Sequence, residues 1–358
     1  MGVFKDMLGS GESLFRNDVA LDYDYMPKVI KYRENEQKQI ALCIKPLFAG
    51  RNARNAIVFG APGVGKTLAC KHLLEEIENE TDDIYHIYIN CWKSDSSYKI
   101  FVEICHSLGY RFTQNKKTDE LFNEIQKIVN KKSVVLVFDE IDKAKDYDFL
   151  YSLLEDLYRK SIVLVTNYRD WVANLDARIK SRLTPESIEF LPYNPDETRG
   201  VLKERRDFAF VSGIWEDEAF ELVVKTTVST GDLRKGLYLM KEAGNIAEDA
   251  SSRKITSEHV KSALAKIDDF SVNKKTELDD SLKTLLDVIK DNSGKKIGDL
   301  YKTYQESGGK ENYKWFQRKI AKLEEGRFIT AKKLTGGAEG NTTIVEYSQQ
   351  GEKKLTDF

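Results

Sequence analysis

Apolar positions follow two different spacings along the chain, and the change between them divides it into parts. Short apolar runs at residues 55–59, 84–90, 133–138 and 161–167 alternate with helical patterns. Strands that alternate with helices are typical of a parallel sheet covered by helices on both faces. We therefore predict an α/β domain here, with an amphipathic helix over residues 33–48 before its first strand.

After residue 192 the apolar spacing becomes helical. Patterns at 197–210, 217–228, 233–248 and 257–265 predict a small all-helical domain. Residues 268–277 are polar without a strong pattern, so we interpret them as a linker. The remaining chain reads helix, helix, helix and hairpin, which is the order of a winged helix-turn-helix.

Composition narrows the class of protein. The chain has 358 residues, enough for two or three domains, of which 41% are hydrophobic and 32% charged. No apolar run approaches the ~20 residues of a membrane span, and the N-terminal residues lack the pattern of a secretion signal. Four cysteines without a CxxC spacing predict neither a disulfide framework nor a metal centre of cysteines. We expect a cytoplasmic protein without a membrane partner.

The first motif with clear chemistry is Gly60-Ala-Pro-Gly-Val-Gly-Lys-Thr67, which fits the phosphate-loop pattern G-x-x-x-x-G-K-[ST]. Its glycines let backbone N–H groups approach a phosphate, and the N-terminus of the following helix adds partial positive charge. Lys66 is expected to reach the β- and γ-phosphates, and the Thr67 hydroxyl to bind Mg²⁺. The alternative is an ordinary glycine turn before a helix. The nucleotide contacts predicted in this stretch are Gly60, Ala61, Pro62, Gly63, Val64, Gly65, Lys66, Thr67 and Leu68.

Polar residues also end two of the predicted strands. The run from Ser133 closes on Asp139 and Glu140, where the first carboxylate is expected to hold Mg²⁺ and the second to orient the attacking water. An acidic helix cap is the alternative interpretation. The strand at 161–167 ends in Asn167, whose amide is placed to hydrogen-bond the γ-phosphate or that water.

The predicted winged helix is the basic part of the chain. The net charge of the whole is −2, but residues 281–334 hold 13 basic and 7 acidic residues, a net charge of +6. The helix predicted at 313–324 turns Phe316, Ile320 and Leu323 inward and repeats basic residues on its other face. Such a stripe on a recognition helix indicates binding of double-stranded DNA, and a solvated face is the alternative. The predicted DNA contacts are Lys314, Gln317, Arg318, Lys322, Lys332 and Lys333.

Together these parts resemble the AAA+ replication initiators of archaea, of the origin-recognition (Orc/Cdc) type. The motifs that carry the resemblance are the phosphate loop, the strand ending in Asp-Glu, the strand ending in Asn167, the helical region and the winged helix. Local runs that fit as well are residues 25–34, 89–91 and 175–183, Pro192-Tyr193, and Gly231-Asp-Leu-Arg234. The implied domains are a lead-in that packs over the nucleotide (1–27), an AAA+ ATPase domain (28–192), a helical lid (193–270) and a winged-helix domain (271–358).

The resemblance also implies site residues and partners. Arg234 is expected to touch the γ-phosphate from the lid, and Arg182 to reach the ATP of a neighbouring subunit with Arg178 in support; intramolecular salt bridges are the alternative for these last two. The resemblance implies ATP or ADP with Mg²⁺ as cofactors and a weak ATPase activity used as a switch. It implies as partners origin DNA in the nucleoid, other initiator subunits and the replicative helicase. The further nucleotide contacts that it implies are Val29, Ile30, Arg33, Tyr193 and Arg205.

Two features qualify the DNA-binding prediction. The wing tip at residues 335–341 has no Lys or Arg and contains Glu339, which leaves phosphate contacts to the strand before it. Residues 110–117 form a basic stretch that matches a second DNA-contacting segment of the family only weakly. The alternative functions are another AAA+ ATPase, such as a clamp loader, and a winged-helix NTPase regulator of transcription or transposition. A clamp loader would normally end in a helical collar.

Overall fold

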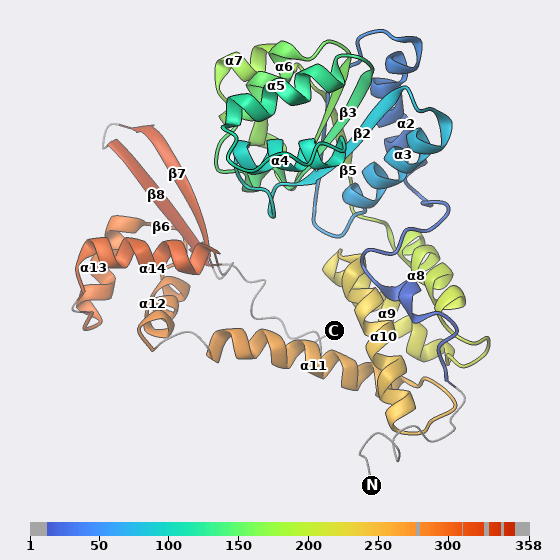
Figure 1. The fold of residues 1–358 in the computed structure, drawn as a ribbon. Coiled ribbons are helices and arrows are strands. Elements are labelled where there is room, and N and C mark those ends of the chain that lie inside the picture. Colours follow the sequence, from blue (N-terminus) through green and yellow to red (C-terminus); the bar gives the residue numbers. More distant parts are fainter. Residues whose placement is uncertain (1–12, 277–279, 310, 326–328, 338–339, 348–358) are drawn as a thin grey trace. The chain divides into compact units, whose positions relative to one another are not determined.

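The structure is a computed structural model in which residues 13–276, 280–309, 311–325, 329–337 and 340–347 are described. It divides into two compact units, Met1–Lys254 and Ile255–Phe358, and each is considered by itself (Figure 1). Within the described residues, no helix is both long enough and apolar enough to cross a membrane.

The first unit is built on a five-stranded parallel sheet with the order β2-β3-β4-β1-β5. The four predicted strands are confirmed, and a fifth was not predicted because exposed polar residues occupy three of its five positions. β5 therefore lacks the apolar run that identified the other strands. The strands are β1 (Ala56–Gly60), β2 (Ile84–Asn90), β3 (Ser133–Asp139), β4 (Lys160–Thr166) and β5 (Glu186–Phe190).

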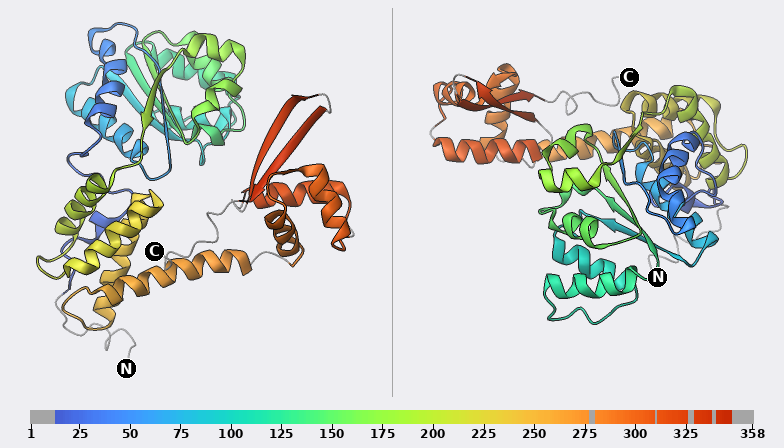
Figure 2. Two further views of the ribbon diagram at one scale, coloured as in Figure 1. Left: turned by 180° about the vertical axis from the view of Figure 1, so that it is seen from behind. Right: turned by 90° about the horizontal axis from the view of Figure 1, so that it is seen from above.

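Helices cover both faces of this sheet, as predicted (Figures 1 and 2). One face is covered by α2 (Glu34–Ile44) and α3 (Lys66–Glu80). The other is covered by α4 (Ser97–Ser107), α5 (Thr118–Val129), α6 (Asp148–Asp156) and α7 (Ala177–Leu183).

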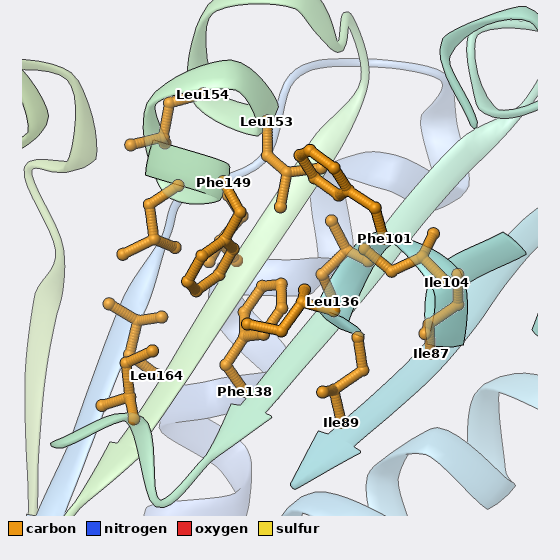
Figure 3. Packing of buried hydrophobic residues seen from close by; sticks show 14 of the residues in the cluster. Ile87, Ile89, Phe101, Ile104, Leu136, Phe138, Phe149, Leu153, Leu154 and Leu164 are labelled. Carbon is orange, nitrogen blue, oxygen red and sulfur yellow. The ribbon is translucent and has the colours of Figure 1, made fainter. Parts of the chain in front are cut away.

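Strand β3 shows why this sheet needs continuous apolar runs. Leu136 and Phe138 point to the α4–α7 side, where Figure 3 shows them against α4 and α6. Val135 and Val137 point to the α2 and α3 side. Since successive side chains of a strand alternate between faces, a sheet buried on both faces accepts an apolar residue at every position.

Three helices complete the first unit: α8 (Pro195–Ala209), α9 (Asp217–Thr230) and α10 (Leu233–Asp249). Asn194 and Glu197 form a reciprocal capping box at the start of α8, and Gly231 ends α9 in the left-handed conformation that glycine tolerates. The lead-in packs on these helices. Arg16 and Asn17 donate backbone hydrogen bonds to Ala209, and a short 3₁₀ turn, Asp18–Leu21, follows.

The second unit contains α11 (Ser257–Thr276), α12 (Asp280–Asp291), α13 (Ile297–Glu306) and α14 (Tyr313–Glu325), with β6 (Lys295–Lys296), β7 (Ile329–Gly337) and β8 (Gly340–Tyr347). The strands pair antiparallel in the order β6-β8-β7. Leu285, Ile289, Leu300, Phe316 and Val345 are among the buried residues of its core. The residues interpreted as a linker continue α11 through Thr276, because residues 268–276 contain no glycine or proline to end the helix.

Candidate nucleotide site and DNA-binding face

The phosphate loop leaves the end of β1 and enters α3, as the motif requires. Gly60, Gly63 and Gly65 all have positive φ, at 151°, 78° and 92°. A side chain at Gly60 would collide with the carbonyl of Phe190, so the first glycine is required by close packing as well as by its conformation. The loop therefore has a backbone conformation that its glycines make possible.

Lys66, the first residue of α3, folds its ammonium back over the loop. Its Nζ donates to the carbonyls of Gly60 and Ala61, at 2.7 and 2.8 Å, and to Oδ1 of Asn167, at 2.8 Å. The side chain is almost fully buried, and this burial lowers the pKa of Lys66 to about 8. The structure thus brings together the loop lysine and the asparagine that follows β4, which the sequence predicted separately.

Asp139 lies at the end of β3 and is buried among hydrogen-bond donors. Thr67 Oγ1 donates to its Oδ2 at 2.6 Å, Tyr88 donates to the same oxygen at 2.7 Å, and the Glu140 backbone N–H donates to Oδ1 at 2.9 Å. Because the Thr67 hydroxyl donates its hydrogen bond to the carboxylate, the lone pairs of its oxygen stay available for a metal ion. Hydroxyl and carboxylate oxygens are the hard ligands that suit Mg²⁺, so these side chains fit the metal.

Glu140 follows in a strained conformation beside the same carboxylate. Its φ is +53°, which a non-glycine residue rarely adopts and which is often found at functional sites. Partial burial, and then the charge of Asp139, raise its pKa above the usual range. The strain and the raised proton affinity are suited to a residue that orients a water molecule and accepts its proton.

One cavity joins these groups to the lead-in and the lid helices. The predicted site residues that line it are Val29, Ile30, Pro62, Gly63, Gly65, Lys66, Thr67, Leu68, Asp139, Glu140, Asn167, Tyr193, Arg205 and Arg234. Lining residues that sequence reasoning missed include Tyr23, Asp24, Pro27, Lys31, Val201 and Leu237. The lead-in was expected over the nucleotide, but only the fold shows which of its side chains reach the cavity.

The lid arginine is held by its own helix cap. Arg234 lies at the start of α10 and donates from Nε and an Nη to the Asp232 carboxylate, at 3.0 and 2.9 Å. The hydrogen bonds to Asp232 raise the pKa of Arg234. A side chain at Gly63 would collide with the same carboxylate, so the lid touches the phosphate loop at this point. Asp232 is therefore a further site residue, which the sequence showed only as part of the lid motif.

Arg33 was predicted to contact nucleotide, but it is not among the described residues that line the cavity. Its buried guanidinium donates to the backbone carbonyls of Val64 and Leu191 and to Glu36, and it stacks 3.8 Å from the ring centroid of Tyr193. These contacts favour a bracing role, because they tie the phosphate loop to the chain that enters the lid. Three further predicted contacts are also absent from the described residues that line the cavity, namely Gly60, Ala61 and Val64.

Arg178 and Arg182 lie on α7 and are likewise absent from the described lining of the cavity. Arg182 is hydrogen-bonded to Glu155 of α6 and lies 5.0 Å from the ring centroid of Tyr151. Arg178 pairs with Asp176, the N-cap of the same helix, at 3.0 Å. Within a single chain the alternative interpretation, intramolecular ion pairing, therefore describes both side chains.

In the second unit, α14 has one apolar and one basic face. Phe316, Ile320 and Leu323 are buried, as predicted, whereas Lys314 and Arg318 are exposed. Gln317 is exposed as well. The side chains of Lys322, Lys332 and Lys333 and the tip residues 338–339, with Glu339, lie outside what is described. In the first unit, residues 110–117 connect α4 to α5 and expose Phe112.

Comparisons with known proteins agree with this arrangement. Residues 50–167 match the family described as "AAA domain", and residues 199–265 match "Cdc6 AAA+ ATPase-type lid domain". ORC1-type DNA replication protein 2 of Methanothermobacter thermautotrophicus is 30% identical over 99% of this chain and 98% of its own length. ORC1-type DNA replication protein 1 of Sulfurisphaera tokodaii is 31% identical over 94% and 90%. The Aeropyrum pernix ORC1 protein, solved in complex with DNA, superposes with a TM-score of 0.71 at 27% identity, covering 97% of this chain and 98% of that one.

The bracing role of Arg33 can be tested by replacing it with lysine. Arg33→Lys keeps the charge but cannot donate to the buried Val64 carbonyl and the partly buried Leu191 carbonyl together, so we expect it to lower the free energy of unfolding by about 1–3 kcal/mol. Arg199→Lys is the matched control, because Arg199 pairs with Glu221 at the surface and should change little. Denaturant unfolding measures both variants. Equally small changes in the free energy of unfolding of both variants would show that the contacts of Arg33 do not stabilise the loop.

Proposed function

The chain belongs to the family of ORC1-type DNA replication proteins, and we propose that it is an ATP-regulated replication initiator that binds duplex DNA at an origin. The observation that carries this proposal is the similarity to such proteins over nearly the whole length of the chain. That length includes the phosphate-loop unit and the unit with the basic helix α14. A clamp loader is disfavoured because the chain has a winged helix where a clamp loader would have a helical collar.

Nucleotide binding follows from the AAA family match and from the cavity around the phosphate loop. We propose that the nucleotide is ATP or ADP, with the phosphates at the loop and the base against the apolar side chains of Val29, Ile30 and Leu237. Mg²⁺, which would neutralise charge on the β- and γ-phosphates, would be held by Thr67 and through water by Asp139. Glu140 and Asn167 would orient the attacking water. Arg205, from α8, would contact the nucleotide from the lid side of the cavity.

Arg234 gives the proposed site a way to respond to the γ-phosphate. In this structure its guanidinium is paired with Asp232, which also lies against Gly63 of the loop. A γ-phosphate would compete with Asp232 for the same donors, because both are oxyanions that accept from a guanidinium. Exchange of this partner would move the start of α10 and so link nucleotide state to the position of the lid.

The second unit supports DNA binding through α14. An exposed basic face on the third helix of a winged helix-turn-helix is suited to the major groove. We propose that Arg318 reads bases, that Lys314, Gln317 and Lys322 contact the groove or its phosphates, and that Lys332 and Lys333 contact phosphates beside the wing. At an origin, several such proteins side by side would form the assembly that recruits the replicative helicase.

The proposed nucleotide chemistry predicts different defects for two variants. Lys66→Ala should abolish ATP binding, because it removes the buried ammonium that the loop holds for the phosphates. Glu140→Gln should keep binding and lose hydrolysis, since the amide cannot accept the proton of the attacking water. Calorimetry measures binding and phosphate release measures turnover. Tight ATP binding by Lys66→Ala would contradict the assignment.

A trans role for Arg182 requires that it leave Glu155 and reach a neighbouring subunit. Arg182→Ala protein should then bind ATP normally and fail to hydrolyse it. Mixing it with Lys66→Ala protein, which keeps an intact Arg182, should restore phosphate release on origin DNA. Normal turnover by Arg182→Ala alone would refute the trans role and leave the ion pair with Glu155 as its function.

The DNA assignment separates base reading from phosphate contact. Arg318→Ala should lose roughly 1–3 kcal/mol on the specific duplex and much less on a scrambled one, because an arginine fork pairs with guanine O6 and N7. Lys314→Ala should weaken both duplexes alike and reduce the salt slope by about one. Salt titrations of binding measure both effects. If Arg318→Ala binds the specific duplex as tightly as the unaltered chain, α14 is not the reader.

A further inference from the structure

Tyr88 is a tyrosine of β2 whose hydroxyl reaches the site although the motifs do not include it. It lies two residues before the end of the strand, opposite Val137 of β3, and packs on the α2 and α3 side of the sheet. Its hydroxyl donates to Oδ2 of Asp139 at 2.7 Å. A hydrogen bond from a hydroxyl to an ionised carboxylate is among the stronger ones in proteins.

The Asp139 carboxylate is held from three directions. Thr67 donates from α3, Tyr88 from β2 and the Glu140 backbone from the segment after β3. Two of these donors bind Oδ2 and one binds Oδ1, and an ionised carboxylate has about four acceptor positions. Capacity therefore remains on Oδ1 for one more donor, such as a water molecule bound to a metal.

Tyr88 is itself held in place, so it can fix the group that it contacts. Its ring packs against the α2 and α3 cluster, and Nζ of Lys71, a residue that lines the cavity, lies 4.9 Å from the ring centroid. Outer partners of this kind orient the ligands of metal sites, and their removal weakens metal binding. A tyrosine that served only as packing would need its ring and not its hydroxyl.

We propose that Tyr88 is a positioning residue for the nucleotide's metal ion: its hydroxyl fixes the Asp139 carboxylate and thereby sets how strongly nucleotide binding depends on Mg²⁺. The inference rests on the proposed function, since it requires that the cavity take a nucleotide with Mg²⁺. It adds a side chain of β2 to a site otherwise built from the loop, the ends of β3 and β4, the lead-in and the lid.

The test uses the full chain with Tyr88→Phe, which removes one oxygen and keeps the ring. Tyr85→Phe is the matched control, because Tyr85 lies on the same strand but packs against the opposite cluster. ADP affinity is measured by calorimetry in EDTA and across a titration of Mg²⁺. We expect equal affinities in EDTA for all three proteins. The Mg²⁺ concentration that gives half of the full Mg²⁺-dependent change in ADP affinity should rise about tenfold in Tyr88→Phe and stay unchanged in Tyr85→Phe. About tenfold is the low end of the loss in metal affinity when a partner of a metal ligand is removed.

Three results would overturn the inference. The first is an unchanged or lower Mg²⁺ midpoint in Tyr88→Phe, and the second is the same rise of the midpoint in Tyr85→Phe. The third is a loss of ADP affinity in Tyr88→Phe that is as large in EDTA as in Mg²⁺, which would indicate a structural defect. If the unaltered chain binds ADP without any response to Mg²⁺, this inference fails while nucleotide binding stands. If the unaltered chain binds no nucleotide under any condition, the proposed function fails and the inference fails with it.

Discussion

The site depends on the position of β1 inside a parallel sheet. Because all five strands run the same way, the ends of β1, β3 and β4 lie along one edge. The loop after β1, the carboxylate after β3 and the amide after β4 therefore meet, although more than 100 residues separate the first from the last. Ligand sites of open α/β sheets form at this edge for the same reason. A change in the order β3-β4-β1 would separate Lys66 from Asn167 or Thr67 from Asp139.

Four buried charged groups among the described residues of the first unit each have partners. Lys66, Asp139, Arg33 and Arg205 are each less than 9% exposed, and each makes hydrogen bonds to named neighbours. Burial of an unpaired charge is strongly unfavourable, so each of these groups fixes the backbone or side chain that satisfies it. The phosphate loop is thus held by Lys66 from the cavity side and by Arg33 from behind. These contacts hold the backbone of the loop in its observed conformation.

The lid and the lead-in form one wall of the cavity together. Arg205 of α8 donates to the backbone of Ala20 and Tyr25, and Lys241 of α10 pairs with Asp22. These contacts attach the lead-in to the helices that also carry Arg234. A movement of α10 would therefore displace Tyr23 and Asp24 of the lead-in together with the guanidinium of Arg234. The proposed DNA-binding face belongs to the other unit, whose basic helix packs on a separate core of apolar residues.

The sequence by itself determined the parts of the chain and located its candidate sites. The phosphate loop, the strand ending in Asp139 and Glu140 and the inward face of α14 could be predicted, because local spacing carries each of them. The family was predicted from the resemblance of the combined motifs to known initiators. The sequence did not identify β5, whose exposed polar residues hide the strand, nor the continuation of α11 through residues read as a linker. Only the tertiary structure decided that Tyr88 contacts Asp139, that Asp232 lies against Gly63 of the loop, and that Arg33 binds the loop from outside the cavity. Such contacts join elements far apart in the chain, so no local pattern records them, and they exist only once the sheet order and the lid have brought those elements together.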